Sequence, residues 1–505
     1  MRAKVRGVIG HGAKGLPVDI ECSFSNSLPG IVIVGSAAKA VDEARERLRA
    51  AFANTELSLP RKRITLNLAP ADLPKNDSGL DLGMAASILL ASKQVQVPNP
   101  TATAFIGELG LDGSVRGVRG IIGRLLAARD KGITDFFIAP DNLPQAKLVP
   151  SIRLFPTEKL SELTLLLDGS IHHPAPIETG DGILAVKTKE KPSNPFIDIV
   201  GQAAAKRALE IAAAGGHNLL FSGPPGTGKT MLAKSLPNLL PPLSQEEIVE
   251  VSQLHSLTGT EYDQIITTRP FRAPHHSASH ISITGGGYNL RPGELSLSHR
   301  GVLFLDEFPE FNRLTIEALR QPLEDRAISI SRAKDSVTYP ADFILIATAN
   351  PCPCGFYGSS KPCTCQVHQI QRYQQHLSGP IMDRIDLFAN VHEVEHARLL
   401  HENANEGGDI HKRIASTRLI QQKRYGNNTK LNANMTNDDI KRLASLAPDA
   451  KTLLDTAATK LDLSARSYMR TIKLARTIAD LGESKTIEPP HIGEALQFRP
   501  QSTTL

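Results

Sequence analysis

One short segment constrains the fold of this chain more than any other. Residues 223 to 230 read Gly-Pro-Pro-Gly-Thr-Gly-Lys-Thr, which fits the pattern G-x-x-x-x-G-K-[ST] at every required position. The apolar run at 218–222 predicts a strand before this segment, and residues 231–235 predict a helix after it. A strand that passes through a glycine-rich turn into a helix is a building unit of α/β folds. We therefore expect an α/β architecture.

The residue types in this segment also indicate what the turn binds. Its glycines let backbone N–H groups turn inwards onto phosphate oxygens, and the helix N-terminus adds partial positive charge. Lys229 is expected to reach the β- and γ-phosphates, and Thr230 to supply a hydroxyl to Mg²⁺. A turn without a ligand is the alternative, which the flanking strand and helix disfavour. We therefore predict an ATP site of the P-loop class, with the phosphates held by Gly223, Pro224, Pro225, Gly226, Thr227, Gly228, Lys229 and Thr230.

Two further apolar runs end in polar residues suited to the same site. Residues 302–305 predict a buried strand that ends at Asp306 and Glu307. Asp306 is expected to hold Mg²⁺, directly or through water, and Glu307 to orient and polarise the attacking water. The run at 343–349 ends at Asn350, which either reaches that water or the γ-phosphate, or merely begins an Asn-Pro turn. The local pattern leaves these two interpretations of Asn350 equal.

Composition narrows the class of protein without choosing a function. Hydrophobic residues make up 41% and charged residues 22% of the 505 residues, as in ordinary globular proteins. No apolar run is long enough to cross a bilayer and the N-terminus lacks a signal peptide's apolar stretch, so we expect no membrane and a cytoplasmic location. The net charge of +5 permits a polyanion as partner. With no Trp and 5% aromatic residues, a base-stacking platform is not expected.

The chain also changes character along its length. Short apolar runs alternate with helix-like stretches in the first part, and Pro-containing, polar residues without periodicity follow. Past about residue 395 the chain becomes mostly helical. We therefore expect an α/β domain at 1–168, a linker at 169–195, a nucleotide-binding core at 196–395 and a helical domain at 396–505.

Taken together, these residues resemble the AAA+ ATPases, and most closely their magnesium-chelatase-like branch. The resemblance places Gln202 near the adenine and makes Asn350 the residue called sensor 1. It also makes Arg384 an arginine finger that acts in trans on the ATP of a neighbouring subunit. Such a fold has an αβα core followed by an α-helical lid.

The helical lid is implied to carry a further arginine, sensor 2, which contacts the γ-phosphate. Arg466 matches that position, and Arg470, one turn further on, is the competing assignment. Guanidinium groups suit the finger and sensor roles because negative charge develops on the transferring phosphoryl group. The catalytic set implied by the resemblance is Lys229, Glu307, Asn350, Arg384 and Arg466.

Longer matches narrow the resemblance to one family. Residues 269–279, 285–287 and 291–301, which lead directly to Asp306 and Glu307, resemble the ComM/YifB family of bacterial proteins. The resemblance implies a homo-hexameric, ATP-dependent DNA helicase or translocase that promotes branch migration during recombination and natural transformation. It would act on single-stranded and branched DNA without reading sequence. The main alternative is a chelatase-type AAA+ ATPase that remodels a partner protein.

Two segments are candidates for the DNA contact. Residues 326–339 alternate as in a β-hairpin, with Arg332 and Lys334 at the tip. In the clade resembled, a hairpin just before sensor 1 points into the pore of the ring, and residues 275–288 would form a second pore insertion. The two basic side chains would track phosphates without reading sequence. A solvated hairpin tip without DNA is the alternative.

A cluster of cysteines follows Asn350 directly. Four of the five cysteines lie within fourteen residues: Cys352, Cys354, Cys363 and Cys365. Four thiolates on a short loop can close a tetrahedral Zn²⁺ site that folds the loop and leaves no open position for catalysis. Surface thiols or a redox pair are the alternatives, and His368 is a possible replacement ligand. We predict structural zinc.

The first domain resembles the proteolytic domain of Lon, of the ribosomal-protein-S5 type, over residues 73–81 and 104–133. The position that matches the Lon lysine is Ile122, and Ser78 is offset from the expected nucleophile. A serine without a base is a poor nucleophile, so we expect no protease activity. The domain would support the ring or contact DNA through basic residues: Arg45, Arg47, Arg49, Arg61, Lys62 and Arg63.

Overall fold

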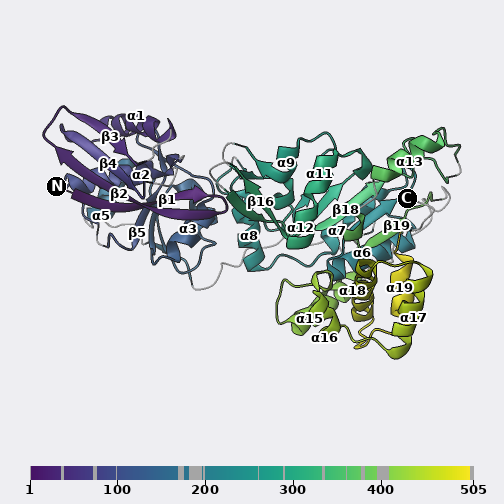
Figure 1. Ribbon diagram of the computed structural model, residues 1–505. Coiled ribbons are helices and arrows are strands. Elements are labelled where there is room, and N and C mark those ends of the chain that lie inside the picture. The colour runs from purple at the N-terminus through teal and green to yellow at the C-terminus, as the bar shows by residue number, and fades with distance from the viewer. Residues whose placement is uncertain are drawn as a thin grey trace. The chain divides into compact units, whose positions relative to one another are not determined.

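The computed structural model divides the chain into two compact units, each of which is described by itself (Figure 1). Unit 1 comprises Met1–Lys187, Ser244–Thr267 and Leu290–Pro292, and unit 2 comprises Thr188–Leu243, Thr268–Asn289 and Gly293–Leu505. The structure describes residues 2–35, 39–71, 75, 77–97, 99–168, 176–180, 196, 199–259, 261–287, 290–332, 336–359, 361–376, 381–394 and 409–500. Among these residues, no helix combines the length and the apolar character that a bilayer span requires.

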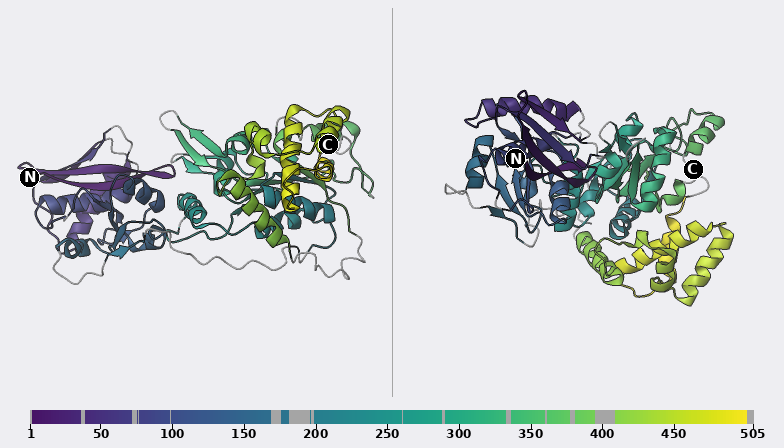
Figure 2. Two further views of the ribbon diagram at one scale, coloured as in Figure 1. Left: turned by 90° about the horizontal axis from the view of Figure 1, so that it is seen from below. Right: turned by 60° about the vertical axis from the view of Figure 1, so that its left-hand side comes forward.

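Unit 1 is built on a mixed eight-stranded sheet in the order β10-β9-β8-β5-β1-β2-β4-β3. Strands β1 and β2 form a long antiparallel ribbon, visible in purple in Figure 2, while β5, β8 and β9 run parallel to one another. The bounds are β1 (Arg2–His11), β2 (Lys14–Ser25), β3 (Gly30–Val34), β4 (Arg63–Ala69), β5 (Thr103–Ile106), β8 (Asp135–Ile138), β9 (Arg153–Pro156) and β10 (Ile177–Glu178). A small hairpin joins β6 (Glu108–Leu109) to β7 (Val115–Arg116).

The helices of unit 1 cover this sheet. Their bounds are α1 (Lys39–Ala53), α2 (Asp81–Ala91), α3 (Ile121–Arg129), α4 (Leu143–Ala146) and α5 (Leu160–Asp168). Helix α2 is buried at almost every position and contacts β1 and β2, because its residues are apolar or small on every side. The expected alternation of strands and helices in the first domain is thus present.

One helix of unit 1 comes from a distant part of the sequence. Helix α8 (Gln245–His255) contacts α3, and Gln253 donates a hydrogen bond to the carbonyl oxygen of Ala13. The sequence assigned this segment to the nucleotide-binding core at 196–395, whereas the structure groups Ser244–Thr267 with unit 1. Helix α8 has a buried face, but the pattern of apolar residues does not say which part of the chain that face meets.

Unit 2 contains a five-stranded parallel sheet in the order β12-β15-β18-β11-β19. The bounds are β11 (Leu219–Ser222), β12 (Phe271–Arg272), β15 (Val302–Leu305), β18 (Ile344–Ala349) and β19 (Leu387–Asn390). The first strand in the chain, β11, lies between the fourth and the fifth. Chain connections therefore leave β11 and β18 in opposite directions, and ligands bind at such a switch point beside the carboxyl ends of the strands.

Helices and a hairpin surround this sheet. The bounds are α6 (Ala203–Gly215), α7 (Lys229–Leu239), α9 (His280–Thr284), α10 (Glu294–Leu297), α11 (Arg313–Ala318), α12 (Arg320–Asp325) and α13 (Val367–His376). Strands β16 (Ala327–Ser331) and β17 (Ser336–Pro340) pair antiparallel in register from Ala327–Pro340 to Ser331–Ser336, which confirms the predicted hairpin. Ile328, Val337 and Tyr339 are buried and Ile330 is half-buried, so one face of the hairpin packs on the unit.

The C-terminal part of unit 2 is helical, as predicted. It consists of α15 (Ile410–Tyr425), α16 (Asn437–Leu443), α17 (Pro448–Lys460), α18 (Ala465–Leu481) and α19 (Pro489–Gln497), which pack together in Figure 1. The predicted apolar side of α18 is buried through Ile472, Leu474, Ala475 and Ile478. This side packs against α6, so the helical part and the sheet share one hydrophobic core. The α/β class, with a parallel-sheet core and a helical C-terminal part, is confirmed.

Candidate active site

The predicted phosphate-binding segment, residues 223–230, lies at the switch point of the unit 2 sheet. Strand β11 ends at Ser222 and helix α7 begins at Lys229, so residues 223–228 form the connecting loop. Gly226 and Gly228 have φ angles of +79° and +89°, and a Cβ added at either would meet only open space. Glycine is therefore favoured at these two positions by the left-handed backbone conformation and not by tight packing. The loop presents open space at the helix N-terminus, as a phosphate site requires.

Lys229 is held across this loop by three acceptors. Its Nζ lies 2.6 Å from the carbonyl oxygen of Gly223, 2.8 Å from that of Pro224 and 3.1 Å from Oδ1 of Asn350. Burial lowers the pKa of Lys229 to about 8, although the nearby Asp306 and Glu307 carboxylates oppose the change. An ammonium group has three donors, so phosphate oxygens at this position would replace the carbonyl acceptors.

Asp306 lies at the end of β15, beside the hydroxyl that the sequence paired with it. Thr230 Oγ1 donates to Asp306 Oδ2 at 3.2 Å, and Thr348 Oγ1 donates to Asp306 Oδ1 at 2.5 Å. Hydroxyl and carboxylate oxygens are the donors that Mg²⁺ prefers, so the residues present fit the expected ion. Thr348 was missed by sequence reasoning. Its signal is a polar side chain inside the otherwise apolar strand β18.

Glu307 takes a conformation unlike that of the strand before it. Its φ of 52° and ψ of 49° are left-handed, and its backbone N–H donates to Thr348 Oγ1 at 3.0 Å. The Glu307 side chain is 52% exposed. His276 Nδ1 lies 3.6 Å from Glu307 Oε2. The sequence placed His276 in the expected second pore insertion at 275–288 and not at the ATP site, so its approach to Glu307 was not predicted.

Asn350 follows β18 and meets the phosphate loop through Lys229. Of the two interpretations that the sequence left open, contact with the site therefore has geometric support. Lys229, Thr230, Asp306, Glu307 and Asn350 come from the ends of three adjacent strands and the helix after one of them. This arrangement can hold a nucleotide's phosphates and a cation, and it has a carboxylate that can accept a proton from water.

Gln202 lies at the start of α6, beside a cavity of about 330 Å³. Its Nε2 donates to the carbonyl oxygen of His392 at 2.6 Å, which joins α6 to the residues after β19. A neighbouring cavity of about 360 Å³ is lined by Ser222, Phe388 and Arg499, among others. The adenine expected near Gln202 would therefore find concave space on this side of the sheet.

Arg384 and Arg466 are brought together on one carboxylate. Arg384 Nη2 lies 2.5 Å from Oε1 of Glu324, and Arg466 forms an ion pair with the same oxygen. These two arginines hold the pKa of Glu324 below its usual range. Arg384 is buried, whereas the Arg466 side chain is 47% exposed. Glu324, in α12, was not predicted, because no local pattern links it to either arginine.

Arg470, the competing assignment for Arg466, has a different environment. It is half-buried, and its Nη1 donates to the carbonyl oxygens of Met382 at 3.2 Å and Ile385 at 2.6 Å. Burial lowers the pKa of Arg470. These contacts brace the segment that carries Arg384, so Arg470 fits a structural role and Arg466 is the better candidate for phosphate.

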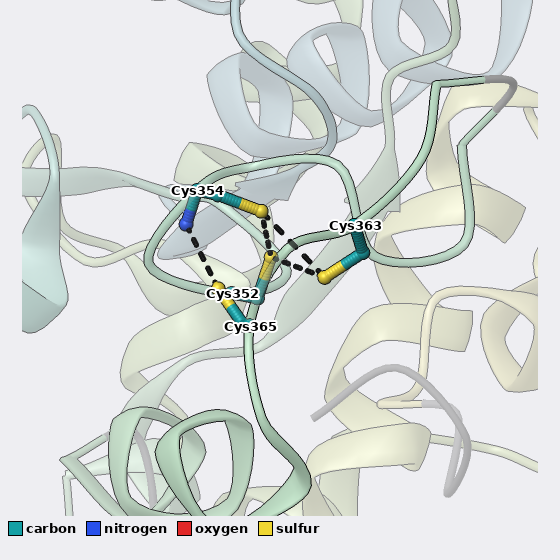
Figure 3. Close-up of side chains that lie close together, drawn as sticks. All are labelled: Cys352, Cys354, Cys363 and Cys365. Atoms are coloured by element: carbon teal, nitrogen blue, oxygen red, sulfur yellow. Dashed lines mark hydrogen bonds between the residues drawn. The ribbon is translucent and has the colours of Figure 1, made fainter.

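The four clustered cysteines converge in space (Figure 3). The Sγ atoms of Cys352, Cys354 and Cys363 lie 3.4 to 3.7 Å apart, and all four sulfurs lie within 4.8 Å of one another. Zn–S bonds of about 2.3 Å place the corners of a tetrahedron about 3.8 Å apart, so the sulfurs fit this metal. Within the described residues, His368 is not part of the group.

The remaining predicted residues lie in the hairpin and in the first domain. Arg332 follows β16 and is exposed, whereas Lys334 lies outside the described residues. Ser78 donates to the carboxylate of Glu108, and Ile122, at the position matching the Lon lysine, is fully buried in α3. Of the basic residues, Arg47 is tied to the buried Asp81 at 2.6 Å. That ion pair gives Arg47 a structural role.

Comparison with known proteins matches three successive models of one family to the chain. Residues 20–142 match the model for subunit ChlI of Mg-chelatase, 195–399 that for magnesium chelatase subunit ChlI, and 404–499 that for the ChlI C-terminal region. A magnesium-chelatase 67 kDa subunit from Heliobacterium mobile is 27% identical over 43% of this chain and 35% of its own length.

Other relatives match nearly the whole chain. Competence protein ComM of Haemophilus influenzae is 43% identical over 95% of this chain and 94% of its own length. The protein YifB of Salmonella typhimurium is 40% identical over 97% and 95%, respectively. With this similarity and an AAA+ site assembled at the strand ends, the chain belongs to the ComM/YifB family of magnesium-chelatase-like AAA+ ATPases.

Proposed function

We propose that this ATPase is a homo-hexameric DNA motor that drives branch migration during recombination and natural transformation. The observation that carries the proposal is the position of the β16–β17 hairpin. In the chain it lies between β15, which Asp306 follows, and β18, which Asn350 follows. The hairpin is therefore part of the chain segment that joins Asp306 to Asn350. A force on the hairpin would act on the segment that connects these two residues of the ATP site.

ATP hydrolysis follows from the residues at the strand ends. The loop 223–228 and Lys229 would hold the phosphates, and Thr230 with Asp306 would hold Mg²⁺, which stabilises the negative charge of the phosphates. Glu307 accepts a proton from the attacking water and orients it towards the γ-phosphate. Asn350, already within reach of Lys229, helps to fix that water or the phosphate.

A ring of subunits gives Arg384 a use that one subunit does not. We expect Arg384 to leave Glu324 and contact the γ-phosphate of a neighbouring subunit, since a guanidinium stabilises the charge that develops during transfer. Arg466 shares Glu324 and would be freed by the same event. Assembly and hydrolysis would thereby be coupled through one carboxylate.

DNA would be held through its backbone. Arg332 is exposed beside the hairpin tip, and Lys334, predicted at the tip, adds a second positive charge. Backbone contacts of this kind do not read sequence, which suits single-stranded and branched DNA. The name of the Haemophilus relative, competence protein, is in keeping with a role in DNA uptake. Exposed arginines of unit 1 that the sequence singled out, such as Arg61, are further candidates.

We also propose that the four cysteines hold one structural Zn²⁺, and that the protein works in the cytoplasm, where thiols stay reduced. The zinc would fold a loop that has little core of its own. The first domain would be a Lon-like support for the ring without protease activity. In place of the lysine of a Ser–Lys dyad, Ser78 has the Glu108 carboxylate as its partner.

A chelatase-type ATPase that remodels a partner protein is the alternative, favoured by the family models. Unlike the ComM and YifB relatives, the Heliobacterium chelatase subunit matches less than half of this chain. The DNA motor accounts for the full length better.

The test is ATP hydrolysis with and without single-stranded, duplex and branched DNA, read together with branch-migration products. We expect branched DNA to raise the ATPase rate. Arg332→Ala should lower this stimulation but leave the DNA-free rate unchanged, and should reduce the slope of log affinity against log salt by about one. Lys451→Ala, which removes an exposed charge from α17, is the control. A hexamer that neither binds DNA nor responds to it would exclude the motor.

A further inference from the structure

The cysteine loop begins where the active site ends. Asn350 is the residue that follows β18, and Cys352 lies two positions further on and is fully buried. The sulfur of Cys352 lies 3.4 Å from that of Cys354 and 3.7 Å from that of Cys363, which the chain reaches only after a surface loop. The sulfur cluster is therefore fastened to the end of the strand that presents Asn350.

The loop backbone also contacts the phosphate loop. Gly355, with φ of +86°, follows Cys354, and its N–H donates to the carbonyl oxygen of Cys352 at 2.9 Å. A Cβ added at Gly355 would lie 2.7 Å from Cδ of Pro225 and 3.9 Å from Cγ of Asn350. Only a residue without a side chain fits there. Gly355 thus lies against both the P-loop and the Asn350 side chain.

The chain after the cysteines returns to the same strand end. Helix α13 begins two residues after Cys365, and Gln374 Nε2 donates to the carbonyl oxygen of Pro351 at 3.4 Å. Tyr373, on the same helix, lies near the backbone of Asn350, and burial raises the pKa of its phenol. Both the cysteine loop and α13 therefore make contacts at the strand end that carries the half-buried Asn350.

We infer that the metal held by these thiolates positions Asn350 and Pro225, so that its occupancy sets the rate of ATP hydrolysis. The loop has little apolar core, since Tyr357 is 45% exposed and three of the four cysteines are partly exposed. Metal binding would supply the free energy that keeps Gly355 against Pro225. This inference rests on the proposed zinc site and on the ATPase chemistry, but not on DNA.

Two glycines of the loop provide a matched pair for the test. Gly355 and Gly358 have φ angles of +86° and +75°, so alanine introduces similar backbone strain at each. A Cβ at Gly358 meets nothing within 4 Å, whereas one at Gly355 meets Pro225. We expect Gly355→Ala to lower the kcat of DNA-free ATP hydrolysis by about tenfold or more, since small misplacements of reacting groups are that costly. Gly358→Ala should keep the wild-type kcat.

Zinc content and the Kd of a fluorescent ATP analogue are measured on the same samples. Both variants should retain one zinc per chain, and their Kd should stay within about threefold of wild type. Equal kcat values for the two glycine variants would overturn the inference. A loss of zinc in Gly355→Ala would also count against it, because the contact with Pro225 would then not be the cause.

Removal of the metal from the whole protein tests the same link without a substitution. After treatment with a zinc-selective chelator, ATP hydrolysis in excess Mg²⁺ should fall about as far as in Gly355→Ala and recover on addition of Zn²⁺. If the protein binds Zn²⁺ stoichiometrically but its kcat does not change when the Zn²⁺ is removed, the inference is overturned and the proposed zinc site is retained. Failure of the chain to bind Zn²⁺ or Co²⁺ at all would overturn both.

Discussion

The amine of Lys229 lies 3.1 Å from the amide oxygen of Asn350, although 121 positions separate the two residues in the chain. Lys229 begins helix α7, and Asn350 follows β18, the neighbour of the strand that leads into the phosphate loop. The contact therefore spans the switch point of the sheet, where the phosphates of a nucleotide are expected. Lys229 is itself buried, and this burial lowers its pKa towards the pH range in which nucleotide binding is measured.

Nucleotide affinity should decrease above about pH 8. Burial lowers the pKa of Lys229 to about 8 in the free protein, and phosphates favour the charged amine. Below that pH the amine is already charged and the affinity is constant. Above it, binding must take up a proton, so the Kd should rise by about tenfold per pH unit. Titration of a fluorescent ATP analogue between pH 7 and 9.5 measures this.

Two variants complete that titration. Lys229→Ala should lose nucleotide binding at every pH, because no cation then faces the phosphates. Arg384→Ala should bind with the wild-type pH dependence, because Arg384 is held by Glu324. A wild-type Kd that stays level up to pH 9.5 would mean that Lys229 remains charged in the free protein.

Glu307→Gln should bind ATP and fail to hydrolyse it. The amide keeps the size of the side chain but cannot accept a proton from water, and the loss of a general base costs about 10²- to 10⁴-fold. The left-handed backbone at Glu307 and its N–H bond to Thr348 do not involve the carboxylate, so the fold should be unchanged. Single-turnover hydrolysis and analogue binding separate the two effects. Normal turnover in this variant would require a different base.

Arg384→Ala should spare nucleotide binding and abolish hydrolysis even in assembled rings. The guanidinium is proposed to stabilise charge on the phosphate of the neighbouring subunit, an effect that in related ATPases is worth about 10³- to 10⁵-fold. Mixing this variant with Lys229→Ala should restore part of the activity, because a mixed interface joins an intact loop to an intact finger. If the mixtures are as inactive as either variant alone, a residue other than Arg384 is the arginine finger.

The parts of the site that sequence predicted are those carried by contiguous residues. The loop 223–230 and the pair Asp306 and Glu307 each lie at a strand end, and their spacing within the segment defines their chemistry. Thr348, His276 and Glu324 were missed because each acts through a partner that only the fold brings close. The same reason applies to helix α8, whose sequence shows a buried face but not that this face belongs to unit 1, where α8 contacts α3.

The Arg384 and Arg466 assignments came from resemblance, since any single arginine is more often a surface ion pair. Their convergence on Glu324 is a tertiary fact without a sequence signal. The cysteines are the opposite case. Four thiols within fourteen residues are constrained to be near one another, so the sequence alone predicted a common site that the sulfur positions support.

The helical part that carries Arg466 depends on one buried carboxylate. Asp480 in α18 is 1% exposed and accepts hydrogen bonds from Arg424 at 2.6 Å, Arg476 at 2.8 Å and Asn432 at 2.8 Å. Arg476 itself is fully buried. Asp480→Ala leaves these arginines without their counter-charge, so the helices should lose about 3–5 kcal/mol of stability. Hydrogen exchange of α15 and α18 measures this locally, which is necessary because a chain of several units does not unfold in one step.

The control is an exposed arginine on the neighbouring helix α16, where Arg442 pairs with Asp439. The side chain of Arg442 is 76% exposed and lies 3.8 Å from Asp439. Arg442→Ala should change the free energy of opening, as measured by hydrogen exchange, by less than about 1 kcal/mol. Because α18 also presents Arg466, Asp480→Ala should lower ATP hydrolysis in proportion to the fraction of helices that are open. Unchanged exchange protection in Asp480→Ala would mean that the two arginines find other acceptors, and that the carboxylate is not what joins α15 to α18.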